Sequence, residues 1–121
     1  MRHPNFILLY VSNVADSTVF YQELLSLAPI ESSPGFAMFA LENGLMLGLW
    51  AKQNVLPMPN GAAGSSEIAF TVDHADEVKH LHQTWSDKKI AIAQIPTAMD
   101  FGYTCVALDP DGHRIRVFAP S

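Results

Sequence analysis

The first half of the chain follows a pattern of one strand, one helix and three short strands. Residues 5–11 form a continuous apolar run of strand length, and the polar pair Ser12-Asn13 after it favours the start of a helix. Apolar residues then recur at helical spacing until Pro29, which is expected to mark the end of the helix. Three further strands are predicted at residues 30–32, 36–41 and 45–51.

The second half repeats this order. Residues 67–72 are predicted to form a strand, and Asp73 is a candidate cap for a helix that ends near Lys88. The apolar face of this helix is predicted to carry Ala75, Val78, Leu81 and Trp85. Three strands follow, at residues 91–95, 103–108 and 114–118.

Each half also has a turn signal before its last strand. Asp111-Gly112 predicts a two-residue hairpin turn, because Asp-Gly tolerates the positive φ angles that such a turn needs. Asn43-Gly44 predicts a tight turn at the corresponding place in the first half. The chain therefore contains the same βαβββ unit twice.

A connection rich in Pro, Gly and Ala, residues 53–66, joins the two copies. We expect one domain over residues 1–121, built from two βαβββ modules at about residues 5–52 and 66–119. The fold class is α+β. A helix covers one face of each module, so the bare faces are expected to form an open, curved mixed sheet around a central cleft that could hold a ligand.

Composition narrows the functional classes. The 121 residues carry a net charge of −5, which leaves no extended basic surface for nucleic acid. The single cysteine, Cys105, lies in a predicted strand, where a buried structural thiol is expected rather than a nucleophile. The apolar run near the N-terminus is too short to span a bilayer and has no cleavage site, so we expect a soluble, cytoplasmic protein without membrane partners.

Two motifs give the duplicated pattern a family resemblance. They are Val11-Ser12-Asn13-Val14 before Ser17 and Phe20-Tyr21, and Asp109-Pro110-Asp111-Gly112 before the last strand. With the βαβββ repeat, they make the whole chain resemble the glyoxalase, bleomycin-resistance and extradiol-dioxygenase superfamily, also called vicinal oxygen chelate proteins. Within it, the chain is most similar to small resistance proteins that bind an antibiotic without altering it.

The resemblance implies four positions for metal ligands, one from each of four strands, which are commonly His, Gln or Glu in the metal-dependent members. Matched through the motifs, these positions fall on Phe6, at or beside Gly48, on Glu67 and on Arg116. Only Glu67 could ligate, and a cation stands at the last position, whereas a divalent metal needs three or more N, O or S donors. We therefore expect no metal and no cofactor.

Glu67 and Arg116 are expected to form an ion pair instead. The alternation of the last strand places Arg114, Arg116 and Phe118 on one face, and an unpaired guanidinium facing a cavity would be costly. By register Glu67 occupies a neighbouring inward position, and a planar guanidinium suits a carboxylate bidentately. The alternative is that both side chains lie at a solvated rim and never meet.

The other inward positions predict a cleft lined by aromatic and thioether groups. They are Phe6, Leu8, Tyr10, Met46, Gly48, Trp50, Ala69, Thr71 and Phe118. Phe6 and Leu8 are expected to be ordinary core, whereas Trp50 either stacks on a flat ligand at the cleft mouth or packs in the core. The candidate ligand-binding residues are Tyr10, Met46, Gly48, Trp50, Glu67, Thr71 and Arg116, with Gly48 leaving room for the ligand. No residue is predicted to be catalytic.

The leading hypothesis is a metal-independent binding protein that sequesters a planar aromatic antibiotic or metabolite. The alternative is a metal-dependent lyase, isomerase or oxygenase whose ligands are displaced by a slip in strand register. A cofactor-free enzyme with Glu67 as its base is a third hypothesis, but an Arg partner would lower the pKa of that base. The resemblance also implies a homodimer with shared clefts, formed either side by side or by exchange of modules.

Overall fold

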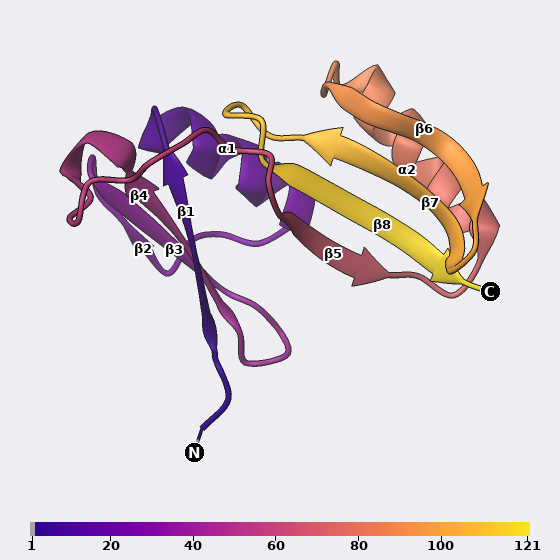
Figure 1. The fold of residues 1–121 in the computed structure, drawn as a ribbon, viewed down its shortest axis with the longest axis horizontal. Helices are drawn as coiled ribbons and strands as arrows, with labels where there is room; N and C mark the ends of the chain where they lie inside the picture. The colour runs from indigo at the N-terminus through magenta and orange to yellow at the C-terminus, as the bar shows by residue number, and fades with distance from the viewer. Residues whose placement is uncertain (1) are drawn as a thin grey trace. The chain divides into compact units, whose positions relative to one another are not determined.

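The computed structural model describes residues 2–121 and divides into two compact units, Met1–Gly61 and Ala62–Ser121 (Figure 1). The first unit consists of β1 (Phe6–Val11), α1 (Val14–Leu25), β2 (Glu31–Ser32), β3 (Phe36–Ala40), β4 (Met46–Ala51) and a short 3-10 helix, η1 (Lys52–Asn54). The second consists of β5 (Glu67–Thr71), α2 (Ala75–Asp87), β6 (Ile92–Met99), β7 (Gly102–Leu108) and β8 (Arg114–Pro120). The α+β class and the repeated βαβββ order are confirmed.

Each module has its own four-stranded mixed sheet. The strand orders are β1-β4-β3-β2 and β5-β8-β7-β6. In both sheets the first and last long strands pair in parallel, and the remaining pairs are antiparallel. The parallel pair brings the start of each module beside its end, which places Glu67 of β5 close to Arg116 of β8.

One face of the second sheet is covered by α2, which packs against β6, β7 and β8 (Figure 1). Phe70 of β5 meets Trp85 of α2 edge to face, with ring centroids 6.5 Å apart, and Phe70 pairs with Val117. Val117 therefore faces the helix. Because side chains alternate along a strand, Arg116 lies on the face that α2 does not cover.

Both helices begin near the predicted residues, but by different means. Asn13 caps α1, as expected, because its side-chain oxygen accepts a hydrogen bond from the backbone N–H of Asp16 at 3.0 Å. The cap of α2 is His74, not the predicted Asp73, and His74 makes no side-chain capping bond. With the helix starting one residue later, Ala75 occupies its first position and is exposed, not buried as expected.

The predicted two-residue turn at Asp111-Gly112 is wrong. The backbone N–H of Asp109 donates to the carbonyl of His113 at 2.9 Å, which leaves a three-residue loop of Pro110, Asp111 and Gly112. In this loop the positive φ falls on Gly112, at +92°. Pro110 fixes a negative φ at the first loop position, which suits a turn followed by a left-handed glycine and not a primed two-residue turn.

The first module uses the same loop. Leu41 donates to the carbonyl of Leu45 at 2.9 Å, and Gly44 has a φ of +85°. The side chain of Asn43 accepts from the backbone N–H of Leu45 at 3.0 Å and stabilises the loop locally. The two copies of the module thus share their hairpin geometry.

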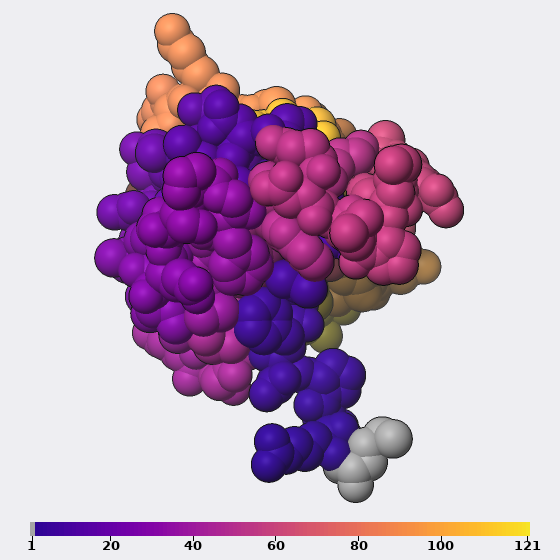
Figure 2. All heavy atoms as spheres, turned by 90° about the vertical axis from the view of Figure 1, so that its left-hand side faces the viewer, coloured from indigo at the N-terminus to yellow at the C-terminus, as the bar shows by residue number. Residues whose placement is uncertain are grey.

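The connection after η1 is anchored by the buried side chain of Val55 and exposes two large apolar side chains, Leu56 and Met58. Val55 is 3% exposed, whereas Leu56 and Met58 are 80% and 79% exposed. In Figure 2 this segment, in pink, stands out from the surface of the first module. Within residues 2–121, no helix has both the length and the apolar character needed to cross a membrane.

Candidate functional site

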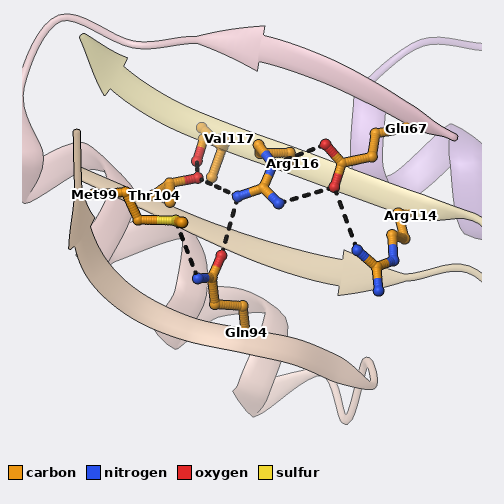
Figure 3. Close-up of polar contacts among 7 residues, drawn as sticks. All are labelled: Glu67, Gln94, Met99, Thr104, Arg114, Arg116 and Val117. Atoms are coloured by element: carbon orange, nitrogen blue, oxygen red, sulfur yellow. Dashed lines mark hydrogen bonds and ion pairs between the residues drawn. The ribbon is translucent and has the colours of Figure 1, made fainter. Parts of the chain in front are cut away.

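The polar centre of the second module is the predicted ion pair, which is confirmed (Figure 3). Nε of Arg116 donates to Oε1 of Glu67 and Nη2 donates to Oε2, each at 2.9 Å. Ala69 pairs directly with Arg116, so Glu67 lies two residues away on the same face of β5. This diagonal placement allows the planar guanidinium to bind both carboxylate oxygens.

Two further residues hold the other side of the guanidinium. Nη1 of Arg116 donates to Oε1 of Gln94 at 3.0 Å and to Oγ1 of Thr104 at 3.1 Å. Thr104 is fully buried, and its hydroxyl donates to the carbonyl of Val117 at 2.9 Å. These bonds use four of the five N–H donors of Arg116, so strands β5, β6 and β7 all fix its position.

The ion pair sets the charge state of the carboxylate. The hydrogen bond from Arg116 lowers the pKa of Glu67, and this effect outweighs the desolvation that would raise it. The same contact raises the pKa of Arg116. Arg114 is a more distant neighbour, with its Nη1 3.8 Å from Oε2 of Glu67. Glu67 is therefore a poor general base at neutral pH, which disfavours a cofactor-free enzyme that uses it.

An apolar rim borders this polar centre on the Arg116 side. The Arg116 guanidinium carbon lies 5.8 Å from the ring centroid of Phe101, which contacts Phe118 edge to face at 5.4 Å. Nε2 of Gln94 donates to Sδ of Met99 at 3.4 Å. Thr71 pairs with Phe118 and is exposed on the same face. The sequence prediction included Thr71 but missed Gln94, Met99, Phe101 and Thr104.

An open depression of about 590 Å³ adjoins the ion pair. Its lining consists of Gly64, Ser65, Ser66, Glu67, Ala69 and Arg114. The carboxylate thus lies between a polar hollow on one side and the aromatic rim on the other.

The first module carries a separate apolar face. Phe6, Leu8 and Tyr10 of β1 pair with Met46, Gly48 and Trp50 of β4. Tyr10 and Trp50 contact edge to face, with centroids 6.2 Å apart and an interplanar angle of 80°. Phe6 and Leu8 were expected in the core, but they are 42% and 45% exposed. Leu9 and Val11, which alternate with them, are the buried residues of β1.

Gly48 does not leave the open room that was predicted. A Cβ at this position would lie 2.8 Å from Cδ2 of Leu8 and 3.0 Å from ring atoms of Phe6 and Phe36. The side chains of the flanking strands therefore fill the space above Gly48. Here the missing side chain lets aromatic and aliphatic neighbours close over the sheet.

The residues at the four implied ligand positions do not fit a metal. Phe6 and Gly48 offer no donor, and both oxygens of Glu67 are engaged by Arg116. In the part of the chain that the structure describes, His, Cys, Asp and Glu form no group of three or more that could hold a metal ion.

Comparisons with known proteins agree with this architecture. A family model described as the Glyoxalase/Bleomycin resistance protein/Dioxygenase superfamily matches residues 3–117. The phenazine antibiotic resistance protein EhpR of Enterobacter agglomerans is 32% identical in an alignment 119 residues long; the alignment covers 94% of this chain and 89% of that protein.

Two solved structures show how widely the fold is shared. The solution structure of protein ATC0852 from Agrobacterium tumefaciens is 43% identical, with a TM-score of 0.88 over 100% of this chain and 99% of that one. A glyoxalase-related enzyme from Fulvimarina pelagi superposes with a TM-score of 0.86 over 98% of this chain and 88% of that one. Its identity is 23%, so this likeness shows the fold alone.

Proposed function

The chain belongs to the glyoxalase/bleomycin resistance protein/dioxygenase superfamily, and we propose that within it the protein binds a planar aromatic antibiotic or metabolite without a metal and sequesters it. The proposal is supported by the 32% identity to a protein named for resistance to phenazine antibiotics. It assigns no catalytic residue to the chain.

The observation that carries the proposal is the bidentate ion pair of Glu67 and Arg116. The single carboxylate at an implied ligand position already has both oxygens in charge-assisted hydrogen bonds. A divalent cation would have to displace a guanidinium that Gln94 and Thr104 also hold. The extra positive charge of Arg116 would also repel a cation.

The surfaces available to a ligand favour a flat, apolar molecule. Tyr10 and Trp50 form an aromatic pair on the face that also carries Met46 four residues earlier in β4, and an indole or phenol ring can stack on a planar ligand. In the second module, considered by itself, Thr71 and the remaining N–H of Arg116 are available for polar contacts. The proposal assigns affinity to aromatic stacking and apolar burial, with few polar contacts to fix orientation.

A tryptophan-fluorescence titration with phenazine, before and after treatment with a chelator, tests the proposal. The protein has two tryptophans, and Trp85 is 3% exposed in the core of the second module, so quenching should be confined to Trp50. Trp50→Phe should remove most of the saturable signal, and Trp85→Phe should retain it. Phenazine should be recovered unchanged, and binding should survive chelation.

Turnover of the compound that disappears with chelator and returns with a divalent metal would contradict the proposal. So would quenching that never saturates, because that behaviour indicates collision in solution and not a site.

A further inference from the structure

We propose that Gln94 selects the ligand: its side-chain amide donates a hydrogen bond from Nε2 to an in-plane acceptor, a ring nitrogen or carbonyl oxygen, on a flat aromatic compound packed against Phe101. This inference rests on the proposed function, that the chain binds a flat aromatic compound, and it adds a ligand contact in the second module that is argued from that module's residues alone. It names the chemical feature that separates a ligand from other flat aromatic molecules.

The orientation of the Gln94 amide is fixed by its neighbour. A guanidinium carries only donors, so the atom of Gln94 that faces Nη1 of Arg116 must be the acceptor, Oε1. The amide nitrogen is thereby directed to the other side, toward Met99 (Figure 3). Arg116 is in turn held by Glu67 and Thr104, which makes this orientation rigid.

The present acceptor of the Nε2 donor is a weak one. Nε2 lies 3.4 Å from the thioether sulfur of Met99, and thioethers accept hydrogen bonds poorly. Met99 is 45% exposed and has an unbranched, flexible side chain that can move aside. A ring nitrogen or carbonyl oxygen in its place would gain a stronger hydrogen bond.

The surroundings of this donor suit an aromatic ligand. Phe101 is 43% exposed, and it is held by the edge-to-face contact with Phe118 and by the Arg116 guanidinium over its ring. A flat compound can cover the exposed part of Phe101 while its edge reaches Gln94. Arg116 acts here as a positioning residue, since four of its five N–H groups are already bonded within the module.

Comparing phenazine with anthracene tests the inference, because the two rings have the same shape and differ in two ring nitrogens. Gln94→Glu keeps an acceptor for Arg116 and removes the Nε2 donor, and Gln94→Met removes both. Gln22→Glu, at an exposed position of α1, makes the same charge change elsewhere. The readout is the ratio of the anthracene Kd to the phenazine Kd.

We expect this ratio to fall about three- to tenfold in both Gln94 variants, through weaker phenazine binding, and to stay unchanged in Gln22→Glu. If wild type binds neither compound, the proposed function itself fails. Suppose instead that wild type binds phenazine and the Gln94 variants keep the wild-type Kd ratio, including the case in which their affinity for both compounds falls equally. The inference then fails and the proposed function stands.

Discussion

At the scale of single residues, position 116 decides the chemistry of the second module. Arg116 neutralises Glu67, orients Gln94 and lies over Phe101, so one side chain joins the polar centre to the aromatic rim. A carboxylate at this position would instead have placed two acids together, an arrangement that favours a cation. With arginine at position 116, the second module instead carries a fixed set of hydrogen-bond donors.

Glu67→Gln should reduce the free energy of unfolding at neutral pH by about 1–2 kcal/mol, because it leaves the partly buried Arg116 without a charged partner. Since folding lowers the pKa of Glu67, the folded state binds protons less readily than the unfolded state. The stabilisation is complete above the ordinary pKa of 4.5 and is lost as the pH falls through the lowered value. Urea unfolding should therefore be measured at a series of pH values from neutral to acid. The difference in unfolding free energy between wild type and Glu67→Gln should become smaller as the pH falls.

Glu42→Gln is the matched control, because Glu42 is exposed in the first hairpin loop. It should change the stability by less than about 0.5 kcal/mol. If the difference in unfolding free energy between wild type and Glu67→Gln is the same at every pH, the charge of the carboxylate does not stabilise the fold through the ion pair.

Cys105 should be unreactive in the folded protein. Its side chain is fully buried, and burial raises the pKa of the thiol to about 11, so almost no thiolate forms in mildly alkaline buffer. A chromogenic disulfide reagent should modify it only at the rate of unfolding, and at once in denaturant. Because the chain has one cysteine, rapid stoichiometric modification under native conditions would contradict its assignment to the core.

How far the site could be predicted depended on the strand that carries each residue. Glu67 and Arg116 lie on regular strands, where alternation alone places both on one face. Gln94 lies on β6, where register shifts occur on both sides of it, so alternation cannot assign its face. The closure over Gly48 was also hidden, because it depends on the rotamers of side chains from neighbouring strands.

At the scale of elements, the length of the β7–β8 loop determines which side chains face the ion pair. A two-residue turn at Asp111-Gly112 would place Ala107 opposite Arg116, whereas the observed three-residue loop places Val106 there. The shift by one residue turns β7 over and brings Thr104 to the Arg116 face. The motif predicted a hairpin correctly, but its two-residue turn would have assigned Thr104 to the opposite face of the sheet.

Asp109 should be the residue on which this loop depends most. Its Oδ1 accepts from the backbone N–H groups of Asp111 at 2.9 Å and His113 at 2.8 Å, and Asp109 is 5% exposed. Asp109→Ala removes this acceptor and should lower the free energy of unfolding by about 1–3 kcal/mol. Asp109→Asn keeps an acceptor oxygen at that place. Its loss of unfolding free energy, measured by urea unfolding, should be at most half of the loss in Asp109→Ala.

A loss of equal size in both variants would mean that the charge of Asp109 matters more than the two hydrogen bonds. Because this loop sets the alignment of β7, ligand binding gives a second readout. If loosening the loop also loosens the alignment of β7, Asp109→Ala should weaken phenazine binding in the fluorescence titration, and Asp109→Asn should not.

At the scale of the whole molecule, the duplicated pattern was the strongest signal in the sequence. The order of elements could be predicted in both modules because each strand and helix has its own hydrophobic period and its own turn residues. What covers the bare sheet faces could not be predicted in this way, since burial by a second surface leaves the same apolar pattern as burial in a core.

The apolar face of the first module is where a second copy of the chain is expected to bind. Phe6, Leu8 and Tyr10 are 42%, 45% and 38% exposed in the single chain, and neighbouring large apolar side chains of this kind mark association surfaces. We propose a homodimer whose contact is centred on Phe6 and Leu8 of this face and leaves the Tyr10–Trp50 pair accessible to a ligand. Wild type should then sediment at about twice the 13.3 kDa of one chain.

Leu8→Glu should shift the protein to 13.3 kDa, because a charge at the centre of this face would lose its hydration on association. Val19→Glu is the matched control: Val19 is 60% exposed, but it lies on α1 and not on the sheet face, so this variant should remain dimeric. A monomeric wild type at high protein concentration, or a dimeric Leu8→Glu variant, would contradict burial of the β1 face by a second copy. If the dimer also completes the ligand site, Leu8→Glu should weaken phenazine binding in proportion to the dimer lost, which the fluorescence titration can follow as protein concentration is varied.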